Sequence, residues 1–246
     1  MTSVPQPPRA SPMVWLRSLL FAAWMFGLAL TMGLACLPLL LGSRKAALAP
    51  VRLWARWVLA GLEMLVGLKV EVQGLEYAPT GPALIAAKHQ SMLDILIGLA
   101  LMPDPCFVMK KELMWVPIFG WFSAKSRMIA VDRSAGAAAV RAMTAKAKAA
   151  LAEGRQIVVY PEGTRQLPGA EPAYKPGVAG LYRELELPCT LVGTDSGALW
   201  PAKGLIKHPG VATYVVLAPI PPGLKRAAFM SQMQTRIEAA SSALAD

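Results

Sequence analysis

An uncharged, apolar run near the start of the chain constrains the fold more than any other feature. No charged residue occurs between Ser18 and Ser43, and the stretch Leu19 to Leu41 is apolar almost throughout. A helix needs about 20 such residues to cross a bilayer. A cleaved secretory signal fits less well, because its apolar core is only about 7–15 residues long. The run predicts a retained membrane helix, although Pro38 leaves open a re-entrant hairpin that enters and leaves on one face.

The segment that follows predicts a second membrane-associated element. Apolar side chains at positions 54, 57, 58, 61, 62 and 65 follow helical spacing and include two tryptophans. Beside them lies a cationic edge made of Arg44, Lys45, Arg52 and Arg56. We expect an amphipathic helix in the headgroup layer, with an ordinary core-packing helix as the alternative. The cationic bias also places the following domain on the cytoplasmic side of the cell inner membrane.

Composition and charge limit the class of partner. Charged residues make up only 16% of the chain, whereas a soluble globular protein has about 25%. The net charge of +10 fits anionic lipid and anionic substrates. Nucleic acid fits less well as a partner, because the sequence has no basic stripe with aromatic platforms and no recognised nucleic-acid-binding motif. Three widely spaced cysteines, at 36, 106 and 189, give neither a disulfide framework nor metal-ligand spacing. We therefore expect membrane lipids as partners, with no nucleic acid and no metal.

Beyond residue 66, strand-like and helix-like segments alternate. Strands are predicted at 68–73, 82–87, 106–109, 128–131, 156–160, 189–193 and 211–218. The clearest helices are 135–153, with Ser134 as its N-cap, 177–187 and 227–244. This alternation predicts an α/β fold with a mixed, largely parallel sheet flanked by helices. The organisation is then a disordered tail (1–13), the membrane-associated helices (14–66) and one domain (67–246).

Polar clusters directly follow three of the predicted strands. They are His89 to Asp94, the pair Asp132 and Arg133, and Glu162 to Arg165. Ligands of open α/β sheets bind outside the carboxyl ends of the strands, so we expect the clusters to converge on one crevice. Residues five apart on one helix point about 140° away from each other. His89 and Asp94 must therefore straddle the strand exit and the first turn of a helix over 91–101.

A histidine with a carboxylate partner can remove a proton from a hydroxyl near neutral pH. Taken alone, such a pair is more often a structural hydrogen bond. A serine hydrolase would need a nucleophile elbow, and the chain has no GxSxG. A non-catalytic lipid-binding protein would need the apolar helices and basic residues but not the histidine. The converging clusters favour chemistry.

The same residues carry a family resemblance. His89 with Asp94 resembles the HxxxxD motif of glycerolipid acyltransferases, and Pro161 to Arg165 is similar to the PEGTR block of that family. The similarity extends over about 68–216, and within the family the chain most resembles 1-acylglycerol-3-phosphate acyltransferases of bacterial type. Further matching positions are Lys110, Glu112, Leu113, Pro117, Gly120, Val131, Asp132, Arg133, Lys175, Pro176 and Gly177.

The resemblance implies transfer of a fatty acyl group from acyl-CoA or acyl carrier protein to the sn-2 hydroxyl of lysophosphatidic acid, giving phosphatidic acid without a cofactor. His89 would be the base and Asp94 its orienting partner. Arg165 would bind the acceptor phosphate, and Glu162 would orient the acceptor or position Arg165. Arg133 would bind phosphate or pair with Asp132 at the start of the next helix. The remaining substrate-binding candidates are Gly163, Thr164, Lys110 and Lys175.

Several departures from the family pattern leave the acceptor open. Lys88 stands before the histidine where asparagine is common, and Arg127 and Ala130 replace the usual glycine and aromatic residue. The run Thr190 to Val192 lacks the usual proline. None of these changes touches the predicted base. Another lysolipid acceptor, such as lyso-ornithine lipid, is therefore the alternative to lysophosphatidic acid.

Overall fold

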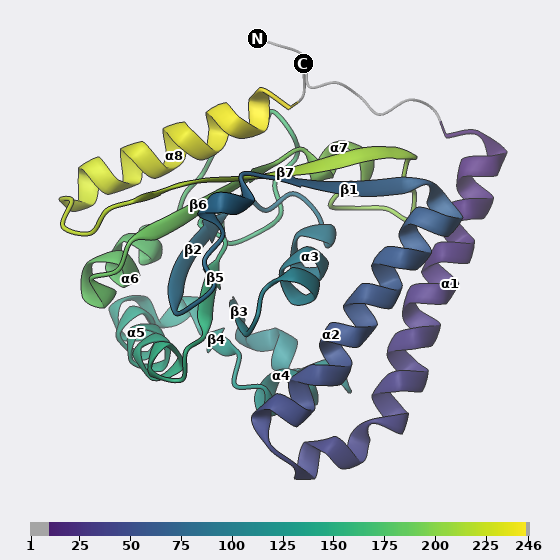
Figure 1. Ribbon diagram of the computed structural model, residues 1–246, viewed down its shortest axis with the longest axis horizontal. Coiled ribbons are helices and arrows are strands. Elements are labelled where there is room, and N and C mark those ends of the chain that lie inside the picture. The colour runs from purple at the N-terminus through teal and green to yellow at the C-terminus, as the bar shows by residue number, and fades with distance from the viewer. Residues whose placement is uncertain (1–9, 245–246) are drawn as a thin grey trace.

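A seven-stranded sheet forms the centre of the molecule (Figure 1). The computed structural model describes residues 10–244. All neighbouring strands are parallel except β6 and β7, so the predicted mixed, largely parallel sheet is confirmed. The strand order is β1-β7-β6-β2-β5-β3-β4. The strands are β1 (Leu68–Gln73), β2 (Ala83–Ala87), β3 (Pro105–Lys110), β4 (Ile129–Val131), β5 (Gln156–Val159), β6 (Cys189–Thr194) and β7 (Gly210–Ile220).

Helices cover both faces of this sheet. One face packs on α2 and α3, with α1 outside them, and the other packs on α5, α6 and α8 (Figure 1). In β2, Ala83 and Ile85 join the first core, whereas Leu84 and Ala86 join the second. A strand buried on both faces reads as one continuous apolar run. The domain helices are α3 (Leu93–Leu101), α4 (Phe119–Lys125), α5 (Gly136–Ala152), α6 (Gly177–Leu185), α7 (Ser196–Leu199) and α8 (Arg226–Ser242).

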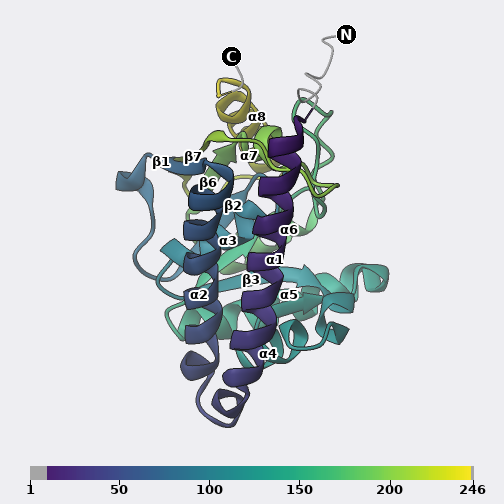
Figure 2. The ribbon, with the colours of Figure 1, turned by 90° about the vertical axis from the view of Figure 1, so that its right-hand side faces the viewer.

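The N-terminal region is a helical hairpin, with α1 (Pro12–Ala35) lying antiparallel to α2 (Arg44–Gly61) (Figure 2). The predicted apolar helix is present as α1, but it ends at Ala35, and the rest of the apolar run forms a tight 3-10 turn over Leu37–Leu41. Pro38 lies in this turn, and its ring cannot donate the next helical hydrogen bond. Residues 1–9 of the predicted disordered tail (1–13) lie outside the described residues. Its last two residues belong to α1, which Ser11 caps.

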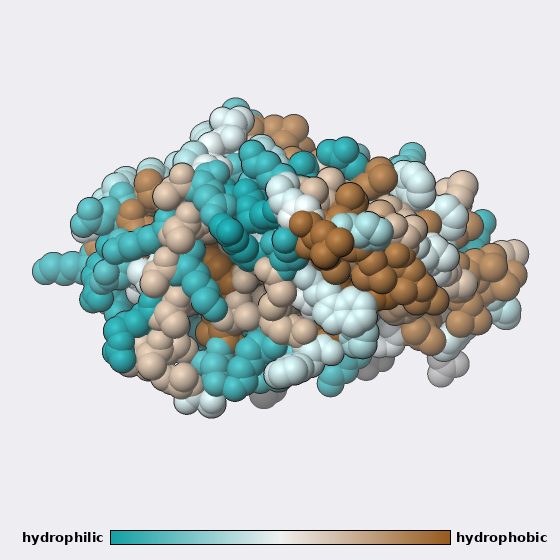
Figure 3. Space-filling model, turned by 90° about the horizontal axis from the view of Figure 1, so that it is seen from below, coloured by the Kyte–Doolittle hydropathy of each residue, from teal (hydrophilic) through white to brown (hydrophobic). Residues whose placement is uncertain are grey.

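Most of the side chains on α1 are uncovered. Among residues 10–244, it is the one helix long and apolar enough to cross a membrane, and only 22% of its apolar window is buried. Ser18, Phe21 and Met25 form the face that packs on the protein. The space-filling view shows apolar side chains gathered at the end of the molecule that carries the hairpin (Figure 3). The largest exposed apolar side chains of this region include Leu16, Leu20, Phe26, Leu30, Leu34, Leu41, Trp115, Phe119 and Trp121.

Two arginines of the predicted basic edge of α2 bind groups of the protein itself. Arg44 forms a two-pronged ion pair with Asp104, with both oxygens 2.8 Å from guanidinium nitrogens. Arg52 donates to the carbonyl oxygens of Leu99 and Met102, at 3.1 and 2.8 Å, and so caps the end of α3. Helix α2 fills the layer between α1 and α3, and its place in a headgroup layer stays a prediction.

Candidate active site

The predicted site residues gather at the carboxyl edge of the sheet. Strands β2, β5, β3 and β4 are adjacent and parallel, so their carboxyl ends open on one side. His89 follows β2, the block of residues 161–165 follows β5, Lys110 ends β3, and Arg133 follows β4. The predicted convergence of the three polar clusters is thus explained by strand direction.

His89 and Asp94 are in contact. The imidazole Nδ1 lies 2.9 Å from Asp94 Oδ2. Helix α3 begins at Leu93, which places Asp94 in its first turn, and the chain folds back so that Oδ2 also accepts from the backbone N–H groups of Gln90 and Ser91, at 2.8 and 2.9 Å. The predicted straddling of loop and helix is therefore present.

Two further donors hold the second oxygen of the carboxylate. Oδ1 of Asp94 accepts from Ser196 Oγ at 2.6 Å and from the Tyr214 hydroxyl at 2.8 Å. The side chain is only 2% exposed, and five hydrogen bonds offset the loss of water. Because a carboxylate oxygen only accepts, Nδ1 of His89 carries the ring hydrogen. Nε2 is then left as an acceptor, and it has no protein partner within residues 10–244.

An aromatic ring fixes the plane of the imidazole. Tyr160 stacks on His89, with 4.1 Å between ring centroids and 20° between planes. Burial, followed by the nearby Asp94 carboxylate, raises the pKa of Tyr160 well above its usual value. The phenol therefore stays neutral and serves as a packing surface beneath the histidine.

Glu162 is turned inward rather than toward the crevice. It is 1% exposed, and its Oε2 accepts from the backbone N–H of His89 at 2.7 Å. Its Oε1 lies 2.9 Å from Lys88 Nζ, and Lys88 also contacts Glu238 of α8 at 2.6 Å. Burial raises the pKa of Glu162, which the Lys88 charge opposes. Glu162 forms no ion pair with Arg165 within the described chain.

The loop that carries Glu162 grips the backbone of His89 on both sides. The carbonyl oxygen of His89 accepts from Gln166 N–H at 2.8 Å, in addition to the Glu162 contact. Gly163 turns this loop with a φ of +71°, a conformation that favours glycine. A Cβ at this position would lie 3.4 Å from Arg133 Nη1, so the glycine also lets the guanidinium pack over the loop.

Arg133 does not pair with Asp132, one of the two predicted roles. Asp132 pairs with Lys111 and accepts from Ser134 N–H at 3.0 Å, and it therefore caps the short turn Arg133–Ala135. Ser134 is consequently not the N-cap of α5, which begins two residues later. Hydrogen bonds from Lys111 and Ser134 lower the pKa of Asp132 to about 2. Arg133 instead lines a pocket of about 410 Å³ together with Lys110.

The other predicted substrate-binding residues border the same edge. Thr164 and Arg165 are exposed on the loop after β5. Lys175 is exposed as well, and its backbone N–H donates to the Pro161 carbonyl at 2.7 Å, which joins it to that loop. Three arginine and lysine residues, Lys110, Arg133 and Arg165, thus lie at the carboxyl ends of the adjacent strands β3, β4 and β5.

Several site residues escaped the sequence reasoning. Three of them are far in the sequence from the residues they contact. Asp94 lies 102 residues from Ser196 and 120 from Tyr214, and Lys88 lies 150 residues from Glu238. No local spacing in the sequence indicates these contacts. Lys88 did carry a signal, because it departs from the residue common in the family. Tyr160 directly precedes the second motif, but an aromatic residue at a strand end is more often a core residue.

The part of the chain that carries this site is similar in sequence to known proteins. Residues 69–194, just over half of the chain, match the sequence profile of the acyltransferase family. A 1-acyl-sn-glycerol-3-phosphate acyltransferase of Pseudomonas aeruginosa is 31% identical over 166 residues, which are 68% of this chain and 65% of that protein. A mouse 1-acyl-sn-glycerol-3-phosphate acyltransferase alpha is 32% identical over 135 residues, covering 54% of this chain and 47% of the relative. The matches therefore span about half to two thirds of these relatives.

A solved structure extends the likeness of fold. The crystal structure of the 1-acyl-sn-glycerophosphate acyltransferase from Thermotoga maritima superimposes with a TM-score of 0.77 at 22% identity, and covers 94% of this chain and 97% of that one. The fold is therefore shared, N-terminal hairpin region included. With the His89–Asp94 pair and the 161–165 block inside the matched region, the chain belongs to the acyltransferase family.

Proposed function

We propose that the protein transfers a fatty acyl group from a thioester to the sn-2 hydroxyl of lysophosphatidic acid and so forms phosphatidic acid. The observation that carries this function is the His89–Asp94 pair, whose Nε2 has no protein partner within the described residues and which lies at the strand edge that also carries Arg133 and Arg165. The names of the relatives point to the same acceptor. A bare lipid-binding protein would have no use for a buried carboxylate with five donors that fixes one histidine tautomer.

The proposed chemistry follows from that tautomer. Nε2 of His89 takes the proton of the acceptor hydroxyl as its oxygen attacks the thioester carbonyl. The carbon–sulfur bond then breaks, and the leaving thiolate recovers the proton from the imidazolium. Asp94 stabilises the charged ring between these steps. Direct attack by the acceptor needs no covalent acyl-enzyme, and the donor is either acyl-CoA or acyl carrier protein.

The cations in front of the histidine are proposed to hold the acceptor phosphate. Arg165 is exposed on the loop beside His89, and a guanidinium offers paired hydrogen bonds to phosphate oxygens. Arg133 and Lys110 add positive charge from the neighbouring strand ends. Glu162 positions the catalytic histidine, because it accepts a hydrogen bond from the backbone N–H of His89 and does not contact the substrate. The lysolipid thereby meets charge at its phosphate and a base at its hydroxyl.

The N-terminal hairpin is proposed to hold the enzyme on the cell inner membrane, with the site on the cytoplasmic side. The exposed apolar surface of α1 suits acyl chains. However, residues along the length of α1, from Ser18 to Gly33, pack against the protein. If α1 spanned the bilayer, the parts of the protein that pack against it would also have to lie in the bilayer. Insertion into one leaflet, the re-entrant alternative, is therefore favoured over a span.

An acceptor panel tests the proposal. The full chain, bound to vesicles, receives labelled acyl-CoA or labelled acyl carrier protein together with lysophosphatidic acid, lyso-ornithine lipid or lysophosphatidylcholine. We expect labelled phosphatidic acid with the acyl group at the sn-2 position. Preferential acylation of lyso-ornithine lipid would replace the proposed acceptor, and no acylation of any lysolipid would refute the function.

A further inference from the structure

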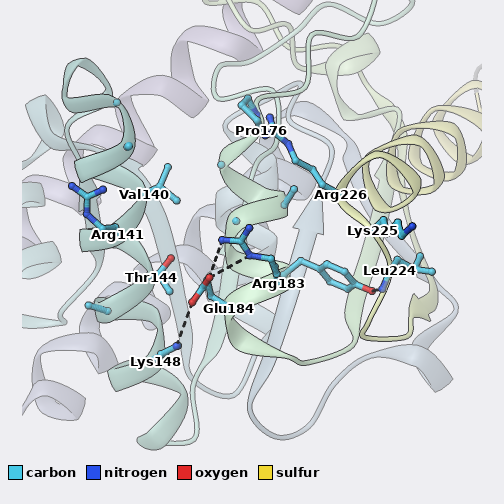
Figure 4. Close-up of a pocket in the computed structure, with 17 residues that line it drawn as sticks. Val140, Arg141, Thr144, Lys148, Pro176, Arg183, Glu184, Leu224, Lys225 and Arg226 are labelled. Atoms are coloured by element: carbon cyan, nitrogen blue, oxygen red, sulfur yellow. Dashed lines mark hydrogen bonds and ion pairs between the residues drawn. The ribbon is translucent and has the colours of Figure 1, made fainter.

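A groove runs along the face of the molecule that lies opposite α1 and α2. It has a volume of about 1060 Å³ and lies between α5, α6 and the segment that leads into α8 (Figure 4). Val140, Ala179 and Tyr182 give it an apolar lining. Arg141 of α5 and Arg183 of α6 stand along its sides, and Leu224 to Arg226 close it near α8.

The lining of this groove is strongly cationic. Five of its 17 residues are lysine or arginine and one is glutamate, whereas the whole chain has 25 lysines and arginines among 246 residues. Glu184 pairs with Arg183 and Lys148, at 2.9 and 3.8 Å. Arg141, Lys225 and Arg226 form no ion pair within residues 10–244. Cations gathered without counter-charges repel one another, which an anionic partner would relieve.

Helix electrostatics do not explain these cations. Lys225 is the N-cap of α8 and Arg226 is its first residue, and no acidic residue occurs in that first turn. Positive charge at a helix N-terminus is unfavourable, because the helix dipole is positive there. The local structure is therefore destabilised slightly by the residues that make the groove basic. A partner outside the helix accounts for them better.

The location indicates a partner that arrives from water. The apolar surface of α1 lies on the other side of the sheet, and the space-filling view shows most of the apolar side chains at the end that carries the hairpin and most of the hydrophilic ones at the opposite end (Figure 3). One end of the groove is formed by Pro176 and Gly177. These follow Lys175, whose backbone is bonded to Pro161 of the active-site loop. A molecule seated in the groove therefore lies beside the catalytic crevice.

We propose that the groove docks an acidic, helical carrier protein that presents the acyl thioester to His89. The inference rests on the proposed function and names the donor for it. An amphipathic helix fits a groove with an apolar lining and charged rims, and α5 lines this groove from Gly136 to Lys148, a wall about 20 Å long. Carboxylates of the carrier would pair with Arg141, Lys225 and Arg226. The lipid acceptor would approach from the opposite, apolar side.

Direct binding tests this proposal independently of catalysis. Fluorescently labelled holo acyl carrier protein is titrated with the full-length parent and with Arg141→Glu, Lys225→Glu and Arg226→Glu variants. Lys146→Glu is the matched control, because Lys146 is exposed on α5 but does not line the groove. We expect each groove reversal to weaken binding by about 10-fold, as reversal of a docking charge does, with the control within about 2-fold of the parent.

The same variants are then assayed with both donors. We expect the KM for the acylated carrier protein to rise with the loss of binding, whereas the KM for acyl-CoA stays at the parent value. Absence of carrier binding to the parent, or equal binding by groove and control variants, would overturn the proposal. An equal rise in the KM for acyl-CoA would also overturn it, since the groove would then hold the nucleotide. Carrier binding without acyl transfer from either donor would refute only the proposed function.

Discussion

The two edges of the central sheet use ionic groups in opposite ways. At the amino edge, Arg155 is 1% exposed and donates to Asp104, Arg127 and Pro105, while Asp104 also binds Arg44. At the carboxyl edge, Nε2 of His89 and the guanidinium of Arg165 have no protein partner within the described chain. Charges that satisfy one another stabilise the fold, and charges left open can bind and react with a substrate. The carboxyl edge also holds paired ions, Lys88 with Glu162 and Lys111 with Asp132, but the open groups are found beside them.

Breaking the amino edge should give the largest effect on stability. Asp104→Ala leaves Arg155 buried without a counter-ion, which costs about 3–5 kcal/mol of unfolding free energy. Although burial acts to raise it, the pKa of Asp104 is held below its usual value by Arg44, which marks how strongly the charged form is held. Urea unfolding measures the change. The kcat per folded molecule should stay near that of the parent, and a loss of kcat without a loss of stability would break the comparison.

A substitution at the carboxyl edge should impair substrate binding and leave stability unchanged. Arg165→Ala removes charge-assisted hydrogen bonds to phosphate, so the KM for lysophosphatidic acid should rise about 10- to 100-fold. Arg165→Lys keeps the charge but loses the planar guanidinium. Its KM for lysophosphatidic acid should therefore lie between the values for the parent and for Arg165→Ala. The melting temperature should not change, since Arg165 is exposed. An unchanged KM in both variants would remove Arg165 from the phosphate site.

Glu162 tests a group that links the histidine to the ion cluster behind it. Glu162→Gln keeps an acceptor for the His89 N–H but removes one counter-charge of the buried Lys88. We expect kcat to fall about 10-fold, less than the about 10²- to 10⁴-fold that a positioned acid–base group contributes, because His89 itself is kept. The KM for the acceptor should not change, because the carboxylate does not face the crevice. A raised KM with unchanged kcat would return Glu162 to the substrate-binding role first predicted for it.

Substitution of Asp132 should give the smallest effect, a loss of stability that depends on pH. Its folded pKa of about 2 is below the usual value near 3.8, so its pairing stabilises the fold above pH 3.8 and is lost as the pH falls toward 2. Asp132→Asn should therefore lower the urea midpoint slightly at pH 6 and by clearly less at pH 2, where about half of Asp132 is already protonated. The effect is small because Asp132 and Lys111 are solvent-accessible. A variant that is equally destabilised at both pH values would contradict the ion pair as the cause.

Local patterns predicted the fold well and the site in part. All seven strands lie within one or two residues of their predicted bounds, because β-branched runs buried on both faces have few alternatives. His89 and Asp94 were identifiable because both lie in one motif. The inward turn of Glu162 and the role of Glu238 depend on packing between distant elements. The bonds of Arg52 in α2 were missed for the same reason, since helical spacing cannot show that carbonyl oxygens at the end of α3 accept from it.

The central claim is that His89 is the base for acyl transfer, and the rate of one variant tests it most directly. Initial rates of labelled acyl transfer from acyl-CoA to lysophosphatidic acid are compared for the parent and His89→Ala on the same vesicles, at equal amounts of folded, membrane-bound protein. The account predicts a rate at least about 10²- to 10⁴-fold lower for the variant, the contribution of a positioned general base. Equal rates for the two proteins would contradict it.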